Sequence, residues 1–275
     1  MISCTKMIET IFSSGFFQRA VVAGGFLALA CGLLGIFLVL RKDAMISHGL
    51  SHVAFAGVAL GLVLNFLPVV ISLIVCIIGS LFILKLKEQA KLPGDTAIGI
   101  LSSAGMALGI LLASLKRNFG VELMTYLFGD ILAIEPIEVW LSLGLALFVV
   151  IAIIIYYHKL VFMTFDRESA LVSGVKVKSL DKLLAILTSI TVVLGIRIVG
   201  LLLVSALTVI PAASALQLSR NFKAALILSS SFSLLSILSG IFLAYVFNLP
   251  ASAAIVFLSI FIFLLTLGLK SVVKN

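Results

Sequence analysis

No charged residue interrupts the interior of residues 43–85, whose sequence is DAMISHGLSHVAFAGVALGLVLNFLPVVISLIVCIIGSLFILK. About 20 apolar residues cross the hydrocarbon core of a bilayer as one helix, so this stretch is long enough for two crossings. Residues 65–68, near its middle, combine Asn and Pro, which are typical of turns. The stretch therefore predicts two membrane-spanning helices joined by a tight turn.

Other apolar runs with no charge, or with a single charge, lie before and after this stretch, and each predicts one or two crossings of the membrane. Runs long enough for a single helix lie at residues 19–41, 95–116 and 138–158. The runs at 182–220, which only Arg197 interrupts, and at 223–270 are each long enough for two helices, with turns expected near Arg197 and at residues 248–250. Because the halves of the first run are short, a re-entrant or broken helix is the alternative there. The expected fold is all-α: a polytopic membrane helix bundle of eight or nine transmembrane helices in a single domain, residues 1–275.

The composition supports a membrane protein and excludes two other classes. Hydrophobic residues make up 63% of the chain and charged residues only 11%, against about 25% charged residues in a typical soluble domain. A soluble enzyme of this size could not bury so much apolar surface, and a disordered chain would be far more polar. The three cysteines, Cys4, Cys31 and Cys76, have no CxxC spacing, so neither a disulfide framework nor a zinc knuckle is predicted.

The basic residues orient the bundle. The net charge is +8, but Lys and Arg lie in short gaps between apolar runs rather than on one polar face, so nucleic acid is not an expected partner. With nine helices and the N-terminus outside, most of the 19 Lys and Arg residues fall on the inner side, as the positive-inside rule requires. The longest polar stretch, residues 158–182, is then a cytoplasmic loop that contains a short helix lying across the ends of the spans. Pro211 is expected to end or kink a helix within the membrane.

Two histidines are the main candidates for chemistry. His48 and His52 are four residues apart, so a helix presents both on one face, where neutral imidazoles bind transition-metal ions. Asp43, Met45 or a residue from another helix could complete such a site. The alternative is that both rings only bond hydroxyl or backbone groups near the start of the helix. His158, at a loop edge, is expected to be an interfacial residue.

Missing motifs narrow the function. No acidic residue is expected in the middle of a span, which argues against a proton-coupled transporter. Position 49 is Gly where the HExxH motif of a metalloprotease needs Glu. The chain lacks the GxxxxGK[ST] phosphate-binding loop, so any ATP that drives this protein must bind another polypeptide.

Several segments together resemble the membrane permease subunit of ABC importers for zinc, manganese or iron(II). In chain order they are GLLGIFLVLR (32–41), SHVAFAGVA (51–59), GDTAIGI (94–100), YLFGDIL (126–132), TFD (164–166), GLLLVSAL (200–207) and IPAA (210–213). The resemblance extends from about residue 16 to residue 260.

The resemblance implies a set of partners and a role for the polar loop. It implies a homodimer with a central path in the lipid of a bacterial-type inner membrane, two cytoplasmic ABC ATPase subunits, and an extracytoplasmic metal-binding protein. No cofactor is bound permanently: Zn²⁺ or Mn²⁺ is transported, Fe²⁺ is a further candidate, and ATP acts through the partner subunit. The residues of the loop at 158–182 that match the ATPase-contacting segment of the family are Asp166, Arg167, Glu168, Ala170 and Gly174.

The resemblance also bears on the histidines. His52 matches the His of the family's Ser-His motif, and His48 stands where members commonly carry Asp. Nitrogen ligands in place of an oxygen ligand favour Zn²⁺ over Mn²⁺. Two other functions stay open from the residues alone: a stand-alone secondary metal transporter or channel, and an intramembrane enzyme that uses both histidines as ligands of a catalytic metal.

Overall fold

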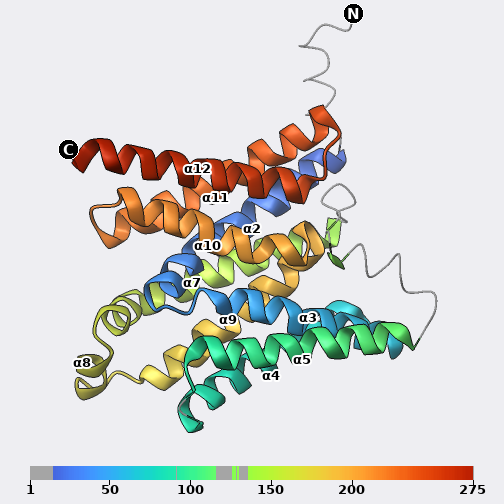
Figure 1. The fold of residues 1–275 in the computed structure, drawn as a ribbon, viewed down its shortest axis with the longest axis horizontal. Helices are drawn as coiled ribbons and strands as arrows, with labels where there is room; N and C mark the ends of the chain where they lie inside the picture. Colours follow the sequence, from blue (N-terminus) through green and yellow to red (C-terminus); the bar gives the residue numbers. More distant parts are fainter. Residues whose placement is uncertain (1–14, 91, 116–125, 128, 130–135, 275) are drawn as a thin grey trace, which may run out of the picture.

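The computed structural model describes residues 15–90, 92–115, 126–127, 129 and 136–274, which are helical apart from short connections (Figure 1). The helices are α2 (Gly15–Leu40), α3 (Met45–Val63), α4 (Pro68–Gln89), α5 (Gly94–Ser114), α7 (Pro136–Phe165), α8 (Arg167–Val172), α9 (Val177–Val199), α10 (Leu201–Leu218), α11 (Phe222–Phe247) and α12 (Ala251–Lys274). The prediction of an all-α fold is confirmed.

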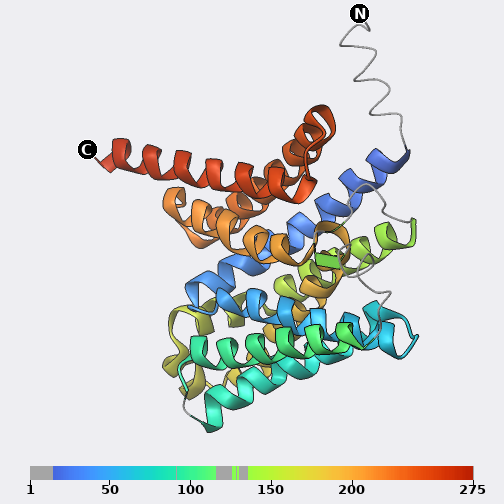
Figure 2. The ribbon, with the colours of Figure 1, turned by 45° about the vertical axis from the view of Figure 1, so that its right-hand side comes forward.

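The long helices run back and forth between two ends of the bundle (Figures 1 and 2). The connections at 41–44 and 219–221 lie at the same end as α8, whereas the turns at 64–67 and 248–250 lie at the opposite end. Local sequence explains these turns, because Pro68 occupies the first turn of α4 and Asn248 adopts the left-handed conformation (φ +52°) directly after α11. Both predicted hairpins are confirmed.

Eight of the described helices are long and apolar enough to cross a membrane. The remaining long helix, α10, has a shorter apolar part, Leu203–Leu218. This agrees with the predicted eight or nine helices. The run at 182–220 does form two antiparallel helices, but they meet at Gly200 (φ +88°) instead of at Arg197.

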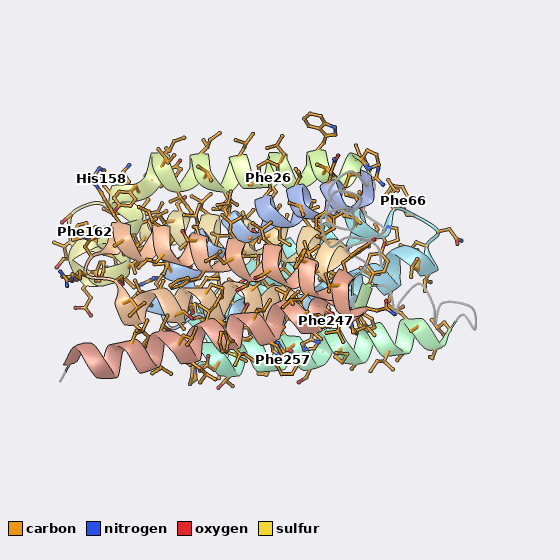
Figure 3. All side chains as sticks on the ribbon, turned by 90° about the horizontal axis from the view of Figure 1, so that it is seen from above. Phe26, Phe66, His158, Phe162, Phe247 and Phe257 are labelled. Carbon is orange, nitrogen blue, oxygen red and sulfur yellow. The ribbon has the colours of Figure 1, made fainter. Side chains whose placement is uncertain are left out.

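The helices differ in how deeply they are buried. Residues of α2, α3 and α9 are mostly buried, and α10 packs against α2, α3, α9, α11 and α12 at the centre of the bundle. In contrast α4, α5, α7 and α12 expose long rows of apolar side chains around the outside, with Phe257 of α12 72% exposed (Figure 3). An apolar outer surface is what a bundle surrounded by lipid requires.

Two expectations about element ends need correction. Of the two alternatives for Pro211, a helix end or a kink, the helix end is excluded, because Pro211 lies inside α10, which continues to Leu218. The segment 158–182 is less of a loop than expected, because α7 continues through His158 to Phe165 and α9 begins at Val177. His158 is exposed in the last turns of α7, near Phe162 and the α8 end of the bundle (Figure 3).

Candidate functional site

Helix α3 is buried along most of its length but leaves two side chains partly exposed. Of residues 46–59 all are buried except His48 and His52, which are half-buried. The i, i+4 spacing places both imidazoles on one face, and that face is the one left uncovered by neighbouring helices. Exposed Met45 lies on the same helix one turn before His48.

The two imidazoles contact each other. Nε2 of His52 lies 3.3 Å from Nε2 of His48, and the rings are perpendicular with centroids 4.8 Å apart. Either ring can be the donor of this contact, depending on which Nε2 carries a hydrogen. Two nitrogen ligands each bonded to one tetrahedral Zn²⁺ lie about 3.3 Å apart, so this pair is spaced to share an ion.

Close packing of α5 fixes the position of His52. A Cβ atom on Gly105 would lie 2.9 Å from the backbone oxygen of His52 and from Cα of Val53, so only glycine allows α5 to approach α3 here. One turn earlier along α3, a Cβ on Gly49 would lie 2.5 Å from the side chain of Ile98. The backbone that carries the histidines is therefore held tightly on one side.

The expected further ligands are not assembled around the histidines. Asp43 instead forms ion pairs with Lys87 and Arg41. Among the residues that the structure describes, no group of three or more His, Cys, Asp or Glu side chains could hold a metal ion. Among the described residues, α3 thus brings together two imidazole nitrogens, and no acidic side chain joins them in a larger group of potential metal ligands.

The hydroxyl groups beside the histidines bond to the backbone. Ser47 Oγ donates to Ala44 O at 3.2 Å and Ser51 Oγ to Ser47 O at 2.9 Å. The buried Nδ1 of His52 has no hydrogen-bond partner among the described residues.

The loop singled out by its sequence forms a short capped helix, α8. Asp166 is its N-cap residue, and the carboxylate accepts a hydrogen bond from the Ser169 N–H at 2.9 Å. Hydrogen bonding to the Ser169 side chain, and then this bond from the Ser169 N–H, hold the pKa of Asp166 below its usual value, so the cap is ionised at neutral pH. Such a cap satisfies one of the backbone N–H groups that the first turn of a helix leaves without a partner.

The end of α8 is closed by a glycine. Gly174 has φ +80°, and the Val175 N–H donates to Ala170 O at 3.0 Å, which is the hydrogen bond of a Schellman cap. Ala170 is fully buried, whereas Leu171 is 51% and Val172 90% exposed. The helix therefore presents an apolar tip at this end of the bundle, a feature that the sequence reading did not single out.

The charged residues of α8 differ in their contacts. Glu168 is exposed in the first turn. Arg167 forms two hydrogen bonds with the carboxylate of Asp181 on α9, at 2.6 and 3.2 Å. These bonds raise the pKa of Arg167 above its usual value. Asp181 was missed from the sequence because nothing local distinguishes it from other acidic residues at helix ends.

Two glycines of the resemblance segments contact each other at the opposite end. Gly129 has φ +70°, and a Cβ on it would lie 2.4 Å from the backbone nitrogen of Gly200. Since Gly200 forms the turn between α9 and α10, Gly129 packs against the backbone of this turn. Asp130 of the first segment lies outside the described residues.

Comparison with known proteins gives consistent matches over nearly the whole chain. A model of the ABC 3 transport family matches residues 13–270. The chain is 31% identical over 265 residues to the manganese transport system membrane protein MntC of Halalkalibacterium halodurans. This match covers 96% of this chain and 91% of that protein. It is 34% identical over 249 residues to the high-affinity zinc uptake system membrane protein ZnuB of Haemophilus influenzae, with coverages of 90% and 95%.

A solved structure is similar in the same way. The structure of PsaBC from Streptococcus pneumoniae in complex with Fab superposes with a TM-score of 0.86 at 28% sequence identity. The match covers 95% of this chain and 94% of that one.

Proposed function

The chain belongs to the ABC 3 transport family and is the multi-pass permease of a bacterial cytoplasmic-membrane ABC importer for manganese or zinc ions, and we propose that His48 and His52 bind the ion during its passage. ATP hydrolysis belongs to a separate subunit in this family. The resemblance inferred from the sequence segments is thereby confirmed at the level of the family.

The observation that supports the histidine site is the open face of α3. From residue 46 to residue 59 this helix is buried except at His48 and His52, two potential metal ligands whose Nε2 atoms are 3.3 Å apart. A transported ion must leave again, so a site with few protein ligands suits transport better than a closed four-ligand site. Two imidazoles, completed by water or by a second copy of the chain, meet that requirement.

The ligand chemistry favours zinc within this pair of ions. Both ligands supplied by α3 are nitrogens, which suit Zn²⁺, whereas Mn²⁺ prefers carboxylate and carbonyl oxygens. Relatives named for manganese transport and for zinc uptake match this chain about equally well. We therefore propose Zn²⁺ as the preferred ion, with Mn²⁺ as the competing substrate.

The same proposal includes the partners. Two copies of the chain enclose a central path, an extracytoplasmic binding protein delivers the ion, and a cytoplasmic ATPase docks at the α8 end. The exposed Leu171 and Val172 provide an apolar contact for the ATPase, and the caps at Asp166 and Gly174 keep that contact rigid. ATP-driven movement of the ATPase then displaces α8 and rocks the attached helices.

The N-cap of α8 gives a direct test of this docking role. Asp166→Ala removes the acceptor for Ser169 N–H, so we expect α8 to fray and metal uptake to fall several-fold at unchanged membrane levels of the permease. Asp166→Asn, which caps as well as Asp, should retain most uptake. Asn221→Ala is the matched control, since it removes the equivalent cap of α11, where Asn221 accepts from Ala224 N–H at 2.8 Å. Equal uptake by Asp166→Ala and wild type in a radiometal assay would contradict the docking role of α8.

The assignment of subunits is tested by tagged purification from native cells in mild detergent. We expect an ATPase to co-purify in stoichiometric amount and, after reconstitution with the binding protein, ATP-dependent uptake of Zn²⁺ or Mn²⁺ into vesicles. A chain that purifies without an ATPase and moves metal without ATP would instead be a stand-alone secondary transporter or channel.

A further inference from the structure

Five charged side chains from separate parts of the chain meet at the α8 end of the bundle. They are Arg41 after α2, Asp43 before α3, Lys87 on α4, Arg167 on α8 and Asp181 on α9, called here the charged cluster. They line a cavity of about 500 Å³. The cluster thus connects α8, the helix proposed to contact the ATPase, with the residues that precede α3, the helix that carries the histidines.

Asp181 is the shared partner in this cluster. The side chain is only 6% exposed, and the carboxylate lies between two guanidinium groups. Arg167 donates to it at 2.6 and 3.2 Å, and Arg41 donates to Oδ1 of the same carboxylate, which also accepts the longer of the two Arg167 bonds. Because the side chain of Arg41 is itself only 11% exposed, this second contact is a largely buried ion pair.

Arg41 continues the connection toward α3. The Nε atom of Arg41 lies 3.8 Å from the carboxylate of Asp43, which also pairs with Lys87. The backbone oxygen of Asp43 accepts a hydrogen bond from Ile46 N–H at 3.0 Å, in the first turn of α3. His48 is two residues further along. Polar contacts therefore run from α8 through Asp181 and Arg41 to the start of the histidine-bearing helix.

We infer that Asp181 is a positioning residue that transmits the displacement of α8 to α3, and so couples ATP hydrolysis to movement of the histidine pair. The inference depends on the proposed function. Separating buried opposite charges leaves each one unpaired, which is strongly unfavourable. The linked segments therefore move together when the ATPase moves α8. The cluster acts on the histidines through the backbone, and none of its members contacts the ion.

The test measures metal ions moved per ATP hydrolysed by the permease–ATPase complex in vesicles, with the binding protein and with Zn²⁺ or Mn²⁺ alone. We expect Asp181→Asn to lower this ratio at least ten-fold in an assembled complex, and Asp181→Glu to restore most of it. Lys178→Gln is the matched control, because Lys178 is also on α9 but forms an exposed ion pair with Glu88 at 3.2 Å. The control should retain the wild-type ratio.

A second variant keeps the test decisive if Asp181→Asn does not assemble. Arg167→Gln breaks the connection at a half-exposed guanidinium and leaves the buried pair of Asp181 and Arg41 intact. A lowered ratio in an assembled Arg167→Gln complex supports the inference. A wild-type ratio in either assembled variant overturns it. A wild-type complex that moves neither ion with ATP overturns the proposed function itself.

Discussion

Replacing His48 and His52 together with Ala is expected to reduce metal uptake about 100-fold or more while the permease still assembles with its partners. Loss of groups that merely orient a metal ligand costs 10- to 100-fold in affinity, and this variant removes both ligands. Assembly should survive because the imidazoles are half-buried and hydrogen-bond to each other. Radiometal uptake at matched membrane levels of permease measures the effect.

A neighbouring variant controls for damage to α3. Ser51→Ala removes a buried hydroxyl one residue before His52, and this hydroxyl bonds only within its own helix in the described contacts, so uptake should stay near wild type. His48→Asp should retain uptake and shift the preference from Zn²⁺ toward Mn²⁺, since an oxygen ligand replaces a nitrogen ligand. Unchanged uptake in the double Ala variant would refute the site.

The second large effect is expected at the contact between α2 and α10. A Cβ atom at Gly35 would lie 2.0 Å from the backbone oxygen of Thr208, closer than any non-bonded contact. Gly35→Ala must therefore push the central helix α10 away from α2. We expect the free energy of unfolding to fall by about 3 kcal/mol, the upper end of the usual cost of overpacking, since backbone atoms cannot rotate aside as a side chain can. The thermal unfolding midpoint of the purified permease in detergent should fall accordingly.

Gly144 on α7 provides the matched control for this substitution. No atom lies within 4 Å of a Cβ built there, so Gly144→Ala meets open space. Alanine is favoured over glycine within a helix by about 1 kcal/mol, so the control should unfold at or slightly above the wild-type temperature. If Gly35→Ala also unfolds at the wild-type temperature, the close packing of α2 on α10 is not as described.

The membrane fold could be predicted from the sequence because its signals are local. Uncharged runs set the number of crossings, and Pro68 and Asn248 mark turns through their own backbone preferences. The turn between α9 and α10 was predicted three residues too early, near Arg197, because a charged residue is a strong signal for a helix end in a membrane protein. The turn lies at Gly200 instead. The backbone there (φ +88°, ψ 160°) is one that essentially only glycine adopts.

The candidate site could be predicted only in part, for the same reason. The pairing of His48 with His52 follows from helical spacing, and their contact at 3.3 Å agrees with it. The partner of Asp43 did not follow, since Lys87 approaches it from another helix. Asp181 and Arg41 are 140 residues apart in the chain, and only the packed bundle brings them together. Neither the buried ion pair nor the apolar tip of α8 leaves a periodic signal in the sequence.

The open face of α3 separates two kinds of evolutionary change. Substitutions at the buried positions from 46 to 59 must preserve the packing of the bundle, and the glycines at 49 and 57 leave no room for a larger side chain. Position 48, in contrast, is half-exposed, so exchange between His and a carboxylate alters the ligand without repacking a neighbouring helix. At the proposed site, a change of one codon at position 48 would therefore change the preferred metal, while packing restricts substitution at the buried positions of the helix.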